Sequence, residues 1–232
     1  MIKYLIKFVS KQKYATDLLD GKLFMHCARY YHMLEDKYGP GQGDLREASI
    51  IPGIAMYKNI NLPIFCLYAV DSDDVSAGRA VIDKRIIEDF GCEESFLVLI
   101  EYKAFAAALH HCETNGYQLE AGLVSYGTPT EELTVKLFEP DEIGNLFIKH
   151  PYFRYQKEYR VVVCKTIDEK MKRCNIDGQE MSVIAPEDMT ASYRIPGGLR
   201  GFAVCYDISK LEQAEDKLFV PIPVDMGKWE AI

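Results

Sequence analysis

Three polar side chains occur at every second position about two-thirds of the way along the chain: Gln156, Glu158 and Arg160. Because side chains alternate between the two faces of a strand, an extended segment over 155–163 would place all three on one face. The segment ends in three consecutive valines, which are typical of buried sheet. A carboxylate carried into such a strand needs a partner, since an isolated buried charge is very costly. Arg160 is the nearest candidate.

The row allows two interpretations. In one, the amide, the carboxylate and the guanidinium face inward and line a binding or catalytic cavity. In the other, 155–163 is an edge strand whose polar face meets water, and Glu158 and Arg160 form an ordinary ion pair on one face. The residue pattern alone leaves both open.

The surrounding sequence predicts the elements that would position these residues. Strands are expected at 2–9, 22–26, 62–70, 96–102, 123–126, 131–138 and 201–207. Helices are expected at 11–20, with Ser10 as N-cap and Gly21 as the stop, and at 79–90, 103–116 and 208–213. Strands and helices mix without regular βαβ alternation, which predicts a single α+β domain over residues 1–232 with a central mixed or antiparallel sheet.

Composition narrows the function classes. The chain has 232 residues, 48% of them hydrophobic, and a formal net charge of −8. This charge argues against broad nucleic-acid binding, which depends on phosphate neutralisation, but it allows a nucleotide-sized ligand. No stretch approaches 18 consecutive apolar residues, and the N-terminal run is interrupted by lysine, so we expect a cytoplasmic protein without a membrane segment.

Metal and nucleophile motifs are weak. The seven cysteines contain no CxxC pair, and adjacent His110 and His111 point about 100° apart on a helix, so no metal site is predicted. Cys27 follows His26, but neighbours on a strand point to opposite faces. The GPGQGD segment lacks the Lys-Ser or Lys-Thr of a phosphate-binding loop, and GxSxG and HExxH are absent.

The aromatic residues and the basic residues near Gln156, Glu158 and Arg160 each allow two interpretations. The tyrosines could line a stacking pocket for a base or could pack in the sheet and helices; they are Tyr30, Tyr31, Tyr152, Tyr155 and Tyr159. The basic residues could attract phosphate, although alternation splits them across two faces; they are Lys149, Arg154, Lys157 and Arg160.

Three segments together carry a resemblance. They read LIKFVS at 5–10, GDLREA at 43–48 and FIKHPYFRYQKEYRVVV at 147–163. Their order resembles a group of bacterial and phage proteins that begin with an "lYKF-S" strand, carry "GD-x-x-E" and finish with "F-x-K…Q/E-x-E-Y-R" before a valine-rich strand. The likeness covers residues 1–165, and 166–232 are expected to add strands and loops to the same domain.

The layout is also similar to the ADP-ribosyltransferase-type fold, in which an early strand supplies a basic residue, a middle strand Ser or Tyr, and a late strand a glutamate. This resemblance implies NAD as a substrate, with Glu158 stabilising an oxocarbenium-like charge and Gln156 orienting the acceptor. The NAD-binding residues that it implies are Lys7, Ser125, Tyr126 and Arg160. Lysine at position 7 differs from the arginine or histidine usual in that superfamily.

Two hypotheses of different classes follow. The first is an ADP-ribosyltransferase-like, NAD-consuming enzyme. The second is a non-catalytic module of a phage or defence system that binds a nucleotide or a protein, with Glu158 and Arg160 holding the sheet together. In both, we expect a cleft bounded by the first strand, the 39–48 loop and the strand at 155–163.

Overall fold

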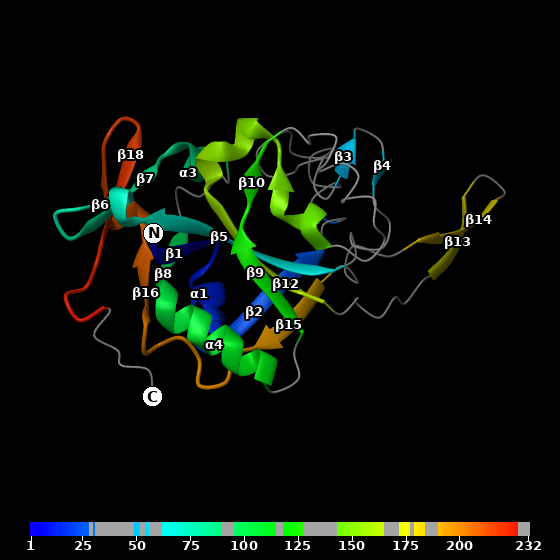
Figure 1. Cartoon of the computed structure of the whole chain (residues 1–232), viewed down its shortest axis with the longest axis horizontal. Coiled ribbons are helices and arrows are strands. Elements are labelled where there is room, and N and C mark those ends of the chain that lie inside the picture. Colours follow the sequence, from blue (N-terminus) through cyan, green and yellow to red (C-terminus); the bar gives the residue numbers. More distant parts are fainter. Residues whose placement is uncertain are drawn as a thin grey trace.

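A computed structural model gives the architecture, which Figure 1 shows as a ribbon. The structure describes residues 1–27, 30, 49–51, 54–55, 62–89, 95–114, 118–127, 143–164, 172–176, 179–183 and 190–226.

Eight of the described strands form one central sheet, and every pairing within it is antiparallel. Six follow the order β15–β2–β5–β1–β8–β16, and β12 pairs with both β5 and β9. Their bounds are β1 (Ile2–Val9), β2 (Lys22–Cys27), β5 (Pro63–Asp71), β8 (Phe96–Glu101), β9 (Leu119–Leu123), β12 (Glu158–Val163), β15 (Thr190–Arg194) and β16 (Ala203–Asp207).

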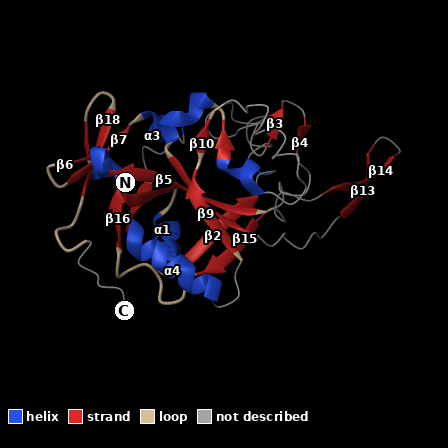
Figure 2. Cartoon of the chain, in the orientation of Figure 1, coloured by secondary structure: helices blue, strands red, loops and turns tan. Residues whose placement is uncertain are grey.

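Two helices, α1 (Gln12–Leu19) and α4 (Tyr102–Thr114), cover one face of this sheet, as Figure 2 shows. Leu18 of α1 and Phe105 of α4 belong to the same buried cluster as Leu5, Leu67 and Val161 of the sheet. The apolar positions at every second residue of the strands therefore meet the apolar stripes of two helices.

A second sheet, β17–β18–β7–β6, packs near the opposite face. Ile6, which alternates with Leu5 along β1, clusters with Ile82 of β7 and Leu218 of β18. Because both faces are covered, both sets of alternating residues in β1 are apolar at its centre. The bounds are β6 (Val75–Ser76), β7 (Arg79–Asp83), β17 (Glu212–Gln213) and β18 (Lys217–Pro221).

Short elements connect or flank the sheets. The 3-10 turns are η1 (Ser72–Asp74), η2 (Ile143–Phe147), η3 (Pro151–Gln156) and η5 (Ile208–Lys210), and α3 spans Arg85–Asp89. The two-stranded pairs are β10 (Ser125–Tyr126) with β11 (Ile148–Lys149), β3 (Ser49–Ile51) with β4 (Ile54–Ala55), and β13 (Lys172–Ile176) with β14 (Gln179–Val183). In the described part of the chain, no helix has the length and apolarity needed to cross a membrane.

The structure confirms the α+β class and most predicted elements. Strands at 2–9, 22–26, 62–70, 96–102 and 201–207 and helices at 11–20 and 103–116 are found with ends shifted by a few residues. Gly21 has φ +86°, which permits the turn that follows α1. The predicted strand at 131–138 and the 39–48 loop lie outside the described residues.

The predicted helix at 79–90 is wrong over its first half. Residues 79–83 form β7, because β18 supplies a partner strand in register with Ala80 and Ile82. Only α3 is helical. Two smaller expectations also fail: Lys11, not Ser10, is the N-cap of α1, and 208–213 contains a 3-10 turn and a short strand.

The predicted strand at 155–163 begins three residues late, at Glu158. Pro151 stands at the start of η3, where its fixed φ suits a helical turn. The turn ends at Lys157, whose φ of 39° and ψ of 49° are left-handed. Residues 155 to 157 therefore do not alternate as a strand, whereas Glu158 and Arg160 do.

Candidate functional site

Strands β1 and β2 part from each other along the same edge of β5. Ile6 of β1 pairs with Tyr68 of β5, and His26 of β2 pairs with Ile64. Strand β12 pairs with β5 from Ile64 to Tyr68, so it occupies the opposite edge. The two N-terminal strands thus leave a gap opposite residues 65–67.

Lys7 extends into this gap. Its ammonium donates a hydrogen bond to the carbonyl oxygen of Cys66 at 2.8 Å and lies 4.7 Å from the ring centroid of Phe65. Lys7 is half-buried. Burial lowers the pKa of the Lys7 ammonium, although the charges of Cys66 and Glu158 act in the opposite direction.

The Glu158 carboxylate is on the other side of β5 and is buried, with 6% of the residue exposed. Arg160, which is 1% exposed, donates from Nε to Oε1 at 2.7 Å and from Nη2 to Oε2 at 3.2 Å. Lys149 of β11 also donates to Oε2, at 3.2 Å. The two cations provide the partners that a buried carboxylate requires.

Burial raises the pKa of the Glu158 carboxyl, but the charges of Arg160 and Lys149 outweigh it and hold the pKa well below its usual range. The thiol of Cys66 hydrogen-bonds to the same carboxylate. Arg160 also donates from Nη1 to the carbonyl oxygen of Leu146 in η2. Glu158 is therefore an ionised acceptor at the centre of a connected polar network.

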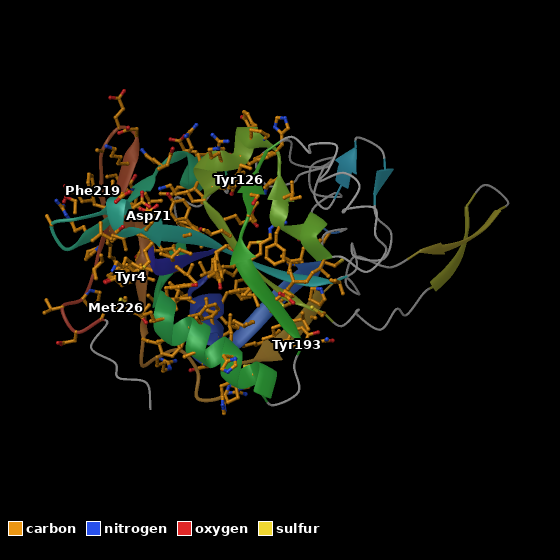
Figure 3. The ribbon with its side chains drawn as sticks, in the orientation of Figure 1. Tyr4, Asp71, Tyr126, Tyr193, Phe219 and Met226 are labelled. Carbon is orange, nitrogen blue, oxygen red and sulfur yellow. The ribbon has the colours of Figure 1, made fainter. Side chains whose placement is uncertain are left out.

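Tyr126 supports the start of β12. Its hydroxyl oxygen accepts a hydrogen bond from the backbone N–H of Glu158 at 2.8 Å, and its carbonyl oxygen accepts from Nη2 of Arg154 at 3.2 Å. Burial raises the pKa of the Tyr126 hydroxyl, and the charge of Glu158 raises it further. Ser125, the neighbour of Tyr126 in β10, is exposed. Figure 3 labels Tyr126 among the side chains of this region.

Gln156 is buried, with 5% of the residue exposed, but it belongs to η3 and not to β12. Its Nε2 donates to the hydroxyl of Tyr155 at 3.5 Å, a long contact. The left-handed Lys157 separates it from Glu158. Strand alternation therefore does not place the amide and the carboxylate on one face.

An aromatic group on β2 was missed as a site feature. The ring of His26 stacks on Tyr30 at 3.8 Å between centroids and meets the edge of Phe24 at 5.0 Å. Burial, with a further contribution from the charge of Lys7, lowers the pKa of His26 to about 4. Phe24 is 50% exposed, and an exposed aromatic alternating with a histidine along one strand was the available signal.

The basic residues near β12 separate by role. Lys149 and Arg160 meet at Glu158, and Arg154 bonds the backbone of Tyr126. Lys157 instead pairs with Asp74, at 2.6 Å, in η1. In the described part of the chain, these four residues therefore do not form one continuous phosphate-binding surface.

The structure thus brings together Lys7, Glu158, Arg160 and Tyr126 around β5. Ser125 is exposed in β10, and Gln156 contacts Tyr155 from η3. The third wall of the predicted cleft, the 39–48 loop, lies outside the described residues. Among the residues that are described, no group of three or more His, Cys, Asp or Glu side chains is placed to hold a metal ion. Comparisons of the chain with protein-family models, curated proteins and solved structures found no match.

Proposed function

We propose that this chain is a cytoplasmic nucleotide-binding module whose ligand lies over the gap between β1 and β2. The observation that carries the proposal is the position of the half-buried Lys7 ammonium, which bonds the carbonyl oxygen of Cys66 and is near enough to His26 for its charge to lower the pKa of that ring. The ring of His26 in turn contacts the exposed Phe24. An ammonium suits a phosphate, and an exposed aromatic ring suits a base. A half-buried group set between two strands is reached by a small ligand more readily than by a protein surface.

In this proposal, Glu158 is the anchor of the site. Both of its oxygens accept hydrogen bonds from Arg160, and one of them also accepts from Lys149. A carboxylate held in this way is well suited to fixing β12 and η2 against β5. Its lone pairs are largely occupied, which disfavours a second role in holding a ribose hydroxyl.

A second candidate is the ADP-ribosyltransferase-like, NAD-consuming enzyme with Glu158 and Gln156 as catalytic residues. One observation favours it: Lys7 and Glu158, from strands on opposite edges of β5, are close enough for the Glu158 charge to affect the pKa of Lys7. A carboxylate near a bound nucleotide could stabilise positive charge on the ribose as nicotinamide leaves. This candidate requires the ligand to reach a side chain that is 8% exposed.

Thermal shift and nicotinamide release together separate these candidates. Purified chain is heated with AMP, ADP-ribose or NAD, because a ligand that binds only the folded state raises its melting temperature. Lys7→Gln tests the gap, and Lys3→Gln is the matched control, since Lys3 is an exposed lysine on the same strand. Release of nicotinamide from NAD is measured in parallel.

The module predicts a shift with AMP or ADP-ribose in wild type and Lys3→Gln, a smaller shift in Lys7→Gln, and no nicotinamide release. The enzyme is supported instead if wild type releases nicotinamide from NAD and Gln156→Ala does not, while the melting temperatures of the two proteins are the same. No shift with any of the three nucleotides at millimolar concentration would refute both.

A further inference from the structure

A cavity of about 610 Å³ lies between β5 and the second sheet. Figure 3 labels Phe219 and Asp71 at this end of the molecule. The lining comes from β5, η1, β6, β7 and β18, together with Lys157 and Asp216, and it includes neither Glu158 nor Lys7. Its volume is within the usual range for small-molecule sites. The cavity is therefore separate from the gap between β1 and β2.

Part of the cavity lining is apolar or aromatic. Tyr68 and Ile82 are buried in the cluster between the two sheets, whereas Phe219, which pairs with Val81, lies on the other face of the second sheet and is partly exposed. The guanidinium of Arg79 lies 4.9 Å from the ring centroid of Phe219 and is held by Glu212 at 2.5 Å. The ring of Phe219 thus already attracts one cation through its face.

Four aspartates supply most of the charge of the lining. Asp74 pairs with Lys157 at 2.6 Å, and Asp83 pairs with an arginine two residues further along. Within the described chain, Asp73 and Asp216 have no ion-pair partner, and both are exposed. These two carboxylates are available to a ligand.

The hydroxyl of Tyr68 lies within the influence of three aspartate charges. Burial raises the pKa of the Tyr68 hydroxyl, and the charges of Asp74, Asp83 and Asp71 raise it further. Lys217, also in the lining, is exposed in the same way as Asp73 and Asp216, so water screens all three charges. The lining therefore combines aromatic surface with four carboxylates, against the three cationic side chains of Arg79, Lys157 and Lys217.

We propose that this cavity binds a small organic cation, with an amine or guanidinium group on an aromatic or aliphatic body. The cationic group binds at Asp73 and Asp216, and the body packs on the partly exposed ring of Phe219. This pairing matches the charge to the carboxylates without an ion pair and the apolar body to the aromatic part of the lining. The proposal is independent of nucleotide binding at Lys7.

Isothermal titration tests it with 2-phenylethylamine and agmatine as probes and the uncharged 2-phenylethanol as the matched control ligand. The test variants are the double substitution Asp73→Asn with Asp216→Asn and, separately, Phe219→Ala. The control variant is Asp17→Asn with Asp20→Asn, which removes the same charge from α1 and its C-cap on another part of the surface. Melting temperatures confirm that each variant folds.

The expected result is saturable binding of at least one amine with one site per chain, and weaker binding of 2-phenylethanol by tenfold or more. The Asp73/Asp216 variant should lose at least tenfold in affinity and the Asp17/Asp20 variant less than twofold. The proposal is overturned by equal losses in both double variants, by equal binding of the alcohol, or by no saturable binding of either amine at millimolar concentration.

Discussion

The guanidinium of Arg160 and the carboxylate of Glu158 lie two residues apart on one face of β12, with Nε 2.7 Å from Oε1 and both residues buried. Lys149 from β11 completes the group. The pair is therefore buried and is not an edge pair in water. It connects β12 with β11, through Lys149, and with η2, through Leu146. Removing either partner would leave an uncompensated charge inside the protein.

Glu158→Gln should lower the free energy of unfolding by about 3 kcal/mol, because the neutral amide no longer compensates the charge of buried Arg160 or that of Lys149. Urea denaturation of wild type and variant measures this loss. The matched control is Glu212→Gln, which breaks an ion pair with Arg79 that is largely exposed and should cost under about 1 kcal/mol. Equal, small losses in both variants would contradict the anchoring role of Glu158.

Tyr126→Phe should cost about 1 to 2 kcal/mol, because it removes the hydroxyl that accepts the backbone N–H of Glu158 and leaves that donor buried. Chemical denaturation measures the loss. Tyr152→Phe is the control. Tyr152 is 66% exposed, so removing its hydroxyl leaves no buried donor without an acceptor. If the two variants are equally stable, the hydroxyl of Tyr126 does not support β12.

His26 should make the protein less stable in mild acid. Its pKa is lowered from 6.5 to about 4, so the unfolded chain binds the proton more tightly than the folded chain does. Stability is therefore lost as the pH falls from about 6.5 and levels off near pH 4. His26→Phe keeps an aromatic ring without the titration.

Between pH 7 and pH 4, the unfolding free energy of wild type should fall by about 1 to 2 kcal/mol more than that of His26→Phe, a figure reduced from the linkage limit because the ring is partly solvated. Denaturation midpoints across this range provide the measurement. Parallel pH profiles for the two proteins would show that His26 titrates normally.

The left-handed backbone at Lys157 predicts an unusual order of stability. Lys157→Gly and Lys157→Ala both remove the ion pair with Asp74, which is partly exposed and worth little. Only glycine also relieves the strain at φ 39°, so Lys157→Gly should be about 1 kcal/mol more stable than Lys157→Ala. Thermal unfolding of the pair decides it, and the reverse order would mean that this backbone is unstrained.

Local patterns predicted the sheet and the central ion pair. The period-2 spacing of Glu158 and Arg160 and the apolar runs of β1, β5 and β8 depend only on neighbouring residues. The start of β12 was misplaced because Tyr155 to Lys157 also alternate in type, while Pro151 directs the segment into a 3-10 turn.

Other features depend on contacts between distant segments. Apolar residues at 81, 82 and 86 fit a helix as well as a strand, and β18, far along the chain, selects the strand. Lys149 reaches Glu158 only because β11 pairs in parallel with β10, and the gap that holds Lys7 exists because β1 and β2 share one edge of β5. Neither arrangement has a signature in local sequence.

The most direct test of the central claim is isothermal titration of ADP-ribose into wild type, Lys3→Gln and Lys7→Gln at low ionic strength. The account predicts one site per chain, with unchanged affinity in Lys3→Gln and at least a tenfold loss in Lys7→Gln. Equal affinities in all three proteins, or no measurable heat of binding at millimolar ligand, would contradict a nucleotide site at the gap between β1 and β2.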